Sequence, residues 1–119
     1  MSNRYEYKQV NASAQVTNEA AAADLITNPG SVTYICVERV VFSVYEAAIG
    51  GGGICELKDT DGNVIYTINA DGVKDVTFDF GDEGLKKGPN VGLKAQVSGA
   101  ATKQASVSIA VSGHTSFRA

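Results

Sequence analysis

Apolar and polar residues alternate along most of this chain, and this period of two limits the possible folds more than any other feature. Three stretches show it most cleanly, namely residues 76–80, 93–97 and 104–112, and residues 5–16 follow the same pattern. Successive side chains of a β-strand point to opposite faces, so this alternation predicts strands with one buried face. A helix would instead need apolar residues three or four positions apart.

Turn-forming residues separate these stretches and allow a count of the strands. Asn-Pro-Gly, Asp-Gly and Gly-Pro-Asn combinations lie between them, and such residues fit the corners of tight turns. The pattern predicts about eight strands in one domain of 119 residues, an all-β antiparallel sandwich that is jelly-roll-like. We expect residues 1–16 to form an N-terminal arm or first strand and residues 17–119 the sandwich body. One helical turn is expected at residues 18–24, where four alanines follow a cap-like Asn18.

The segment of residues 33–45 departs from clean alternation. It carries apolar side chains on both faces, with Val37 and Val41 on one and Val40 and Val44 on the other. A sandwich strand normally has one wet face, so two interpretations remain. Either a β-bulge near Glu38 exchanges the faces, or the outer face of the strand meets another subunit. Both can hold at once.

Charge and hydropathy narrow the possible partners. Charged residues make up 19% of the chain and the net charge is −3, without the basic stripe that nucleic acid binding requires. No apolar run approaches the length of a membrane span. The first residues do not resemble a signal peptide, so we expect synthesis in a cytoplasm and reduced thiols.

Cys36 and Cys55 are predicted to be small buried hydrophobic residues, although their spacing does not exclude a disulfide.

The segment Asp59-Thr60-Asp61-Gly62-Asn63 has the alternate oxygen-bearing residues of a calcium loop. An EF-hand loop needs glycine at its sixth position and glutamate at its twelfth, and this frame offers neither. Asp-Gly between two strand-forming runs is instead a strong hairpin signal, and Asp59 or Thr60 can cap such a turn. We therefore predict a hairpin and no specific metal site, with adventitious calcium at this acidic tip left open.

The remaining chemical candidates do not form a catalytic pattern. The four glycines at 50–53 are followed by a strand pattern and not by the Gly-Lys-Ser/Thr of a phosphate loop. His114 is the only histidine and has no nucleophile motif to accompany it. Asp79 and Asp82 could be imagined as a glycosidase pair, but they lie in a glycine-rich turn where aspartates are usually solvated. We predict that the protein is not an enzyme and carries no cofactor.

Three stretches together resemble a known family. They are Ala-Asp-Leu-Ile-Thr-Asn-Pro-Gly-Ser-Val at residues 23–32, the hairpin at residues 56–68 and the final strand at residues 105–113. In this order, over residues 20–113, they resemble small β-sandwich virion proteins of tailed bacteriophages, especially capsid decoration (cement) proteins. The resemblance implies assembly and not catalysis. It implies a homotrimer on the capsid surface that binds and stabilises the shell of major capsid protein. From charge and hydropathy we expect neither nucleic acid nor a membrane as partner.

A surface with little charge and many small residues suits such broad protein contact. As interface residues we predict Tyr5 and Tyr7 in the arm, Val41 and Tyr45 on the two-faced strand, and Phe117 near the C-terminus. The N-terminal arm could extend to a neighbouring subunit and add a strand to an exposed sheet edge. The alternative function is a carbohydrate- or receptor-binding jelly-roll module at a tail tip or fibre.

Overall fold

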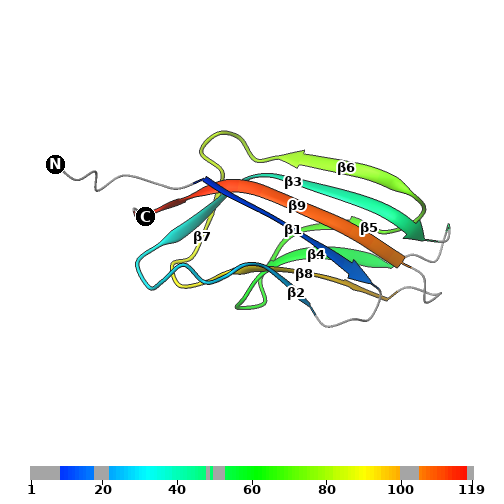
Figure 1. The fold of residues 1–119 in the computed structure, drawn as a ribbon, viewed down its shortest axis with the longest axis horizontal. Helices are drawn as coiled ribbons and strands as arrows, with labels where there is room; N and C mark the ends of the chain where they lie inside the picture. Colours follow the sequence, from blue (N-terminus) through cyan, green and yellow to red (C-terminus); the bar gives the residue numbers. More distant parts are fainter. Residues whose placement is uncertain (1–8, 18–21, 48, 50–52, 100–104, 118–119) are drawn as a thin grey trace.

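The computed structural model describes residues 9–17, 22–47, 49, 53–99 and 105–117, and these residues form two packed antiparallel sheets (Figure 1). The first sheet has the order β1 (Gln9–Thr17), β9 (Ala105–Ser116), β3 (Tyr34–Ala47) and β6 (Lys74–Asp79), and β7 (Leu85–Lys87) also pairs with β3. The second sheet has the order β2 (Ala23–Ile26), β8 (Leu93–Ser98), β4 (Ile54–Asp59) and β5 (Val64–Asn69). The predicted all-β sandwich is therefore confirmed, with nine strands in the described residues where about eight were expected. Within those ranges, no helix is long and apolar enough to cross a membrane.

The core lies between the two sheets and is built from the apolar positions of the alternating pattern. Phe42, Leu57, Leu93 and Ile109 are fully buried and come from β3, β4, β8 and β9. Fully burying a side chain of this kind contributes roughly 1.5–3 kcal/mol relative to leaving it exposed. The core therefore depends on residues far apart in the sequence, as expected for a sandwich in which each sheet alone would expose its apolar face.

A β-bulge in β3 explains why this strand carries apolar residues on both faces. Against β9, Val37 pairs with Gly113 and Arg39 pairs with Ser112, so Glu38 is the extra residue. Before the bulge Val37 points into the core, and after it Val40 does, because the extra residue exchanges the two faces. The bulge expected near Glu38 is thus confirmed. It keeps a strand of 14 residues in contact with the core over most of its length.

The sequence pattern missed two short strands, and one of them overlaps the end of the segment expected to form a helical turn. Part of the segment expected to be helical, Ala23 and Asp24, lies in β2, while residues 18–21 fall outside the described ranges. β2 pairs with β8, and β7 pairs with β3, so both strands are held by tertiary pairing. With only 4 and 3 residues, neither is long enough to show a period of two.

The structure describes only the second part of the N-terminal segment, residues 9–17. Residues 9–17 form β1, which pairs with β9 from Gln9 opposite His114 to Thr17 opposite Ser106. This part of the predicted arm is therefore a strand of the first sheet. Residues 1–8 lie outside the described residues.

Candidate assembly surfaces

The central part of the outer face of the first sheet carries mostly small, uncharged side chains. We call this central part the serine-rich face. Along each strand, its residues alternate with residues that point into the core. Its members are Asn11, Ser13, Gln15, Val41, Ser43, Thr77, Ser108, Ala110 and Ser112. None of these residues is ionisable, and the charged side chains of Arg39, Asp75 and Asp79 border them on the same sheet.

The register places the members of the serine-rich face in rows across four strands. Ala110 of β9 lies opposite Ser13 of β1 on one side and Val41 of β3 on the other, and Val41 lies opposite Thr77 of β6. A shallow hollow of about 270 Å³ opens at this row and is lined by Ser13, Val41 and Ala110 among others. An apolar centre with a polar surround is the usual anatomy of a protein–protein interface.

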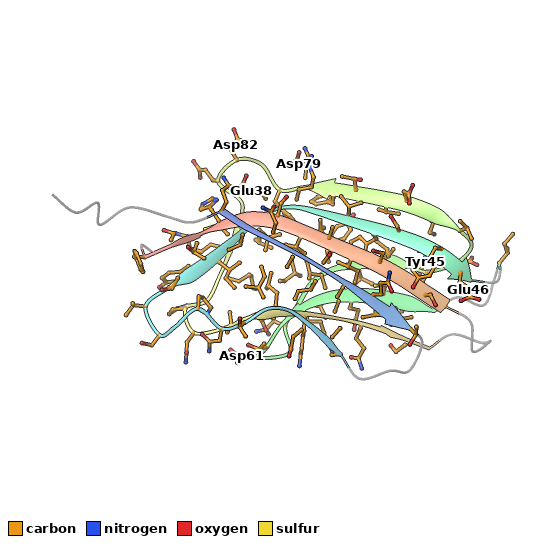
Figure 2. All side chains as sticks on the ribbon, in the orientation of Figure 1. Glu38, Tyr45, Glu46, Asp61, Asp79 and Asp82 are labelled. Carbon is orange, nitrogen blue, oxygen red and sulfur yellow. The ribbon has the colours of Figure 1, made fainter. Side chains whose placement is uncertain are left out.

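Two of the five predicted interface residues share the outer face of the first sheet. Val41 is half-buried at its centre, and Tyr45 lies further along β3 with 48% of its surface exposed (Figure 2). Phe117 is exposed just beyond Ser116, which pairs with Tyr34 at the opposite end of β3. That end is about 35 Å from Tyr45 at roughly 3.3 Å per strand residue. The structure therefore does not bring Phe117 together with Tyr45, and an interface role for each remains a prediction.

The other two predicted interface residues, Tyr5 and Tyr7, fall outside the described residues. Their contact with a neighbouring subunit therefore stays a prediction.

A second surface, the aromatic edge, lies between the last strands of the two sheets and consists of Tyr66, Phe78 and Phe80. Tyr66 on β5 stacks against Phe78 on β6 with ring centroids 4.5 Å apart, and Phe80 packs edge-on against Phe78 at 4.8 Å. Phe42 lies beneath, 6.0 Å from Tyr66. Although Phe78 points to the core side of β6, 37% of its surface is exposed, because β6 is the last strand of its sheet and no strand in the described ranges lies beyond it. The sequence showed the alternation of 76–80 but not its proximity to Tyr66, which depends on sheet packing.

A hollow over the bulge of β3 holds the only histidine of the chain. It measures about 660 Å³, and the residues that line it include Cys36, Glu38, Asp82, Lys86 and His114. His114 Nδ1 lies 2.6 Å from Glu38 Oε2, so the histidine is paired with a carboxylate at the strand irregularity. Within the described ranges there is no group of three His, Cys, Asp or Glu residues that could hold a metal ion.

The two aspartates considered as a glycosidase pair are exposed at the turn between β6 and β7 (Figure 2). Asp79 accepts hydrogen bonds from the Gly81 backbone N–H at 2.9 Å and from Arg39 Nη2 at 3.2 Å. These two partners, the backbone donor first, hold the pKa of Asp79 below its usual value. The Asp79 carboxylate thus caps the turn after β6 and pairs with Arg39 of β3.

The Asp59–Asn63 segment is the hairpin corner between β4 and β5, as predicted. Asp59 is 2% exposed, and its carboxylate accepts hydrogen bonds from the backbone N–H groups of Asp61 and Asn63 and from Asn63 Nδ2, at 2.9 to 3.1 Å. Lys87 Nζ lies 3.8 Å away. Burial by itself raises the pKa of Asp59, but these hydrogen bonds and Lys87 outweigh it and leave the pKa lowered. The carboxylate oxygens are thus engaged by protein donors and act as the cap of the turn.

Both cysteines are free and buried, as predicted. Cys55 points into the core, where burial, assisted by Glu56, raises its pKa to about 12. Burial also raises the pKa of Cys36, although Lys86 opposes this. Neither thiol has the lowered pKa of a reactive cysteine.

Comparison with known proteins shows which fold this chain resembles. No family model matches the chain, and no curated protein sequence matches it. Its double antiparallel sheet is similar to jelly-roll-like chains from viral particles. The likeness at these low identities shows the fold.

Three solved structures have chains with this similar fold. A chain from the acidic stable capsid structure of Helicobacter pylori bacteriophage KHP30 has a TM-score of 0.57 and 17% identity, over 91% of this chain and 93% of that one. A chain of the cyanophage Pam1 capsid asymmetric unit has a TM-score of 0.54 and 17% identity, over 96% of this chain and 88% of that one. A chain of Sulfolobus Turreted Icosahedral Virus has a TM-score of 0.55 and 13% identity, and the match covers 96% of this chain but 30% of the viral chain.

Proposed function

We propose that this protein is a structural component of a virion. The observation that carries the proposal is the nearly end-to-end match with chains from two phage capsid structures, at 91% and 93% coverage for one pair and 96% and 88% for the other. In both cases the matched chain is therefore one sandwich of about this size. Fold alone does not define function, so the surfaces must also agree with an assembly role.

Within the virion, the role we propose is that of a capsid decoration (cement) protein. It would be made in the host cytoplasm, bind the major capsid protein from the capsid surface and stabilise the shell as a homotrimer. The serine-rich face supports this role, because a sheet face with an apolar centre at Val41 and Ala110 can make many modest contacts. The candidate catalytic groups support it too, since Asp59, Asp79 and His114 all serve structural contacts.

The experiment is co-sedimentation of the protein with capsid shells that lack it. Wild-type protein is expected to pellet with shells of the major capsid protein and to raise the temperature at which they disrupt. Ala110→Arg places a long cation at the centre of the serine-rich face and is expected to abolish pelleting. Thr67→Arg is the matched control, because Thr67 is exposed on the outer side of the other sheet and should retain binding.

Two results would contradict the proposal. Absence of the protein from purified virions of its source would remove the structural role altogether. Equal binding of shells by both arginine variants would remove the serine-rich face as the contact. If the protein instead binds a glycan array at submillimolar concentration and Tyr45→Ala abolishes that binding, the tail-tip receptor module replaces the decoration protein.

A further inference from the structure

The outer edge of β6 is open beside the aromatic edge. β6 pairs with β3 through residues 74–79, and no strand in the described ranges pairs with its other side. An unpaired strand edge exposes backbone N–H and C=O groups and acts as a template for another strand. Here the edge also leaves Phe78 37% exposed next to half-buried Val76. A further strand would satisfy the backbone and cover both side chains.

The segment before β1 has the composition of such a strand. Residues 4–8 read Arg-Tyr-Glu-Tyr-Lys, so two tyrosines fall on one face of an extended chain and three charged residues on the other. β6 presents the complementary pattern, with Val76 and Phe78 on its core side and Asp75, Thr77 and Asp79 on its outer side.

In one antiparallel register, the tyrosines of residues 4–8 meet the apolar side of β6 and the charged residues meet its polar side. This register places Tyr5 opposite Phe78 and Tyr7 opposite Val76. The remaining pairs of the same register are Arg4 with Asp79, Glu6 with Thr77 and Lys8 with Asp75. Aromatic pairs and opposite charges directly across two strands each contribute roughly 0.2–1 kcal/mol. A slip of one residue would turn both tyrosines to the outer face, so the pattern specifies the register strongly.

The strand must come from a second copy of the chain. Lys8 adjoins Gln9, which pairs with His114, and His114 pairs with Cys36 near the beginning of β3. Asp75 pairs with Ser43 near the other end of β3, about 20 Å further along the sheet and three strands away from β1. Consecutive residues are only about 3.8 Å apart, so a chain cannot place its own Lys8 beside its own Asp75.

We propose that residues 1–8 of one copy add as an antiparallel strand to the β6 edge of a neighbouring copy, with Tyr5 and Tyr7 covering Phe78 and Val76. This inference rests on the proposed assembly function and names the subunit contact that would build the oligomer. The β5 edge fits less well, because its outward residues Thr67 and Asn69 offer no carboxylate to Arg4 or Lys8. The contact is a head-to-tail one, so it closes into a ring when the rotation between copies allows it.

Cysteine cross-linking of the full-length chain tests this register. Glu6→Cys and Thr77→Cys proteins are mixed at high concentration, equilibrated in a glutathione redox buffer, and the linked peptides are quantified by mass spectrometry. We expect a disulfide between positions 6 and 77 at roughly tenfold the yield given by the matched control Thr67→Cys. Thr67 and Thr77 are both exposed threonines on the last strand of their sheets, so they differ only in the edge probed.

Charge reversal provides a second readout that does not depend on cysteines. Lys8→Asp alone and Asp75→Lys alone are expected to shift the oligomer toward monomer in light scattering, and combining the two is expected to restore it. A yield at position 77 no higher than at position 67 overturns the proposal, as does a dominant disulfide joining two copies of position 77. The strand exchange can fail these tests while the proposed function stands. In that case the variants still bind shells and Ala110→Arg does not.

Discussion

The Nδ1 atom of His114 lies 2.6 Å from Oε2 of Glu38, and this contact joins β9 to the extra residue of the β3 bulge. The two residues are 76 positions apart in the sequence. Because the bulge leaves Glu38 without a partner in the strand register, a side-chain contact is well placed to fix its position. The pair thus stabilises the irregularity that turns Val40, Phe42 and Val44 into the core.

A double-mutant cycle measures this coupling. Glu38→Ala and His114→Ala are each expected to destabilise the protein, and the double variant to be more stable than their sum predicts by about 1 kcal/mol, since the contact is partly buried. Urea unfolding of the four proteins gives the value. Additive effects within about 0.3 kcal/mol would show that the contact does not hold the bulge.

Gly113 is the residue of β9 that lies against the bulge, and it is expected to tolerate no side chain. A Cβ atom there would overlap the Cys36 carbonyl oxygen and lie 3.2 Å from the Glu38 backbone nitrogen. Both neighbours are backbone and cannot move aside without displacing β3. Gly113→Ala should lower the free energy of unfolding by about 1–3 kcal/mol in urea denaturation. Ala110→Ser on the same strand is the control, and a Gly113→Ala variant as stable as that control would refute the close approach.

Asp59 is expected to make stability depend on acid pH. Its folded-state pKa is lowered from 3.8, so the unfolded chain binds more protons as the pH falls through this range. The stabilisation is complete well above pH 3.8 and is lost as the pH falls through the folded-state pKa. Asp59→Asn should therefore be less stable than wild type at pH 7, by roughly 1–3 kcal/mol, and the difference should shrink toward pH 2. A difference that stays constant between these pH values in urea titrations would count against the ionised turn cap.

The two thiols are expected to differ in reactivity toward a small alkylating reagent. Cys55 is fully buried with a pKa raised to about 12, so it should react only when the protein unfolds. Cys36 is 2% exposed but lines the hollow over the bulge and should be modified first. Mass spectrometry of native protein over time, with Cys36→Ser as the control, checks the order. Faster modification of Cys55 would contradict its place in the core.

The sandwich class could be predicted because a period of two over long stretches has one physical interpretation, a strand with one buried face. The hairpin at Asp61-Gly62 could be predicted for a similar reason, since Gly62 adopts a φ of +95° that favours glycine. By contrast β2 and β7 could not be found, because strands this short exist only where β8 and β3 supply hydrogen-bonding partners.

Among the candidate surfaces, the sequence indicated Val41 and Tyr45 but missed the aromatic edge. Tyr66 and Phe78 are 12 residues apart on strands of different sheets, and no local pattern records that their rings stack at 4.5 Å. The same holds for the rows of the serine-rich face, whose members come from β1, β9, β3 and β6. Only strand order brings these side chains together.

By itself the sequence determined what is local, namely the strand-forming pattern, the turns and the low surface charge, because each depends on neighbouring residues along the chain. The tertiary structure decided what depends on pairing between distant strands. It placed a bulge at Glu38, engaged Asp59 and His114 in structural contacts, and left β6 with one edge that no strand in the described ranges pairs. The physical reason is that hydrogen bonds and packing between sheets join residues whose separation in sequence carries no record of their contact.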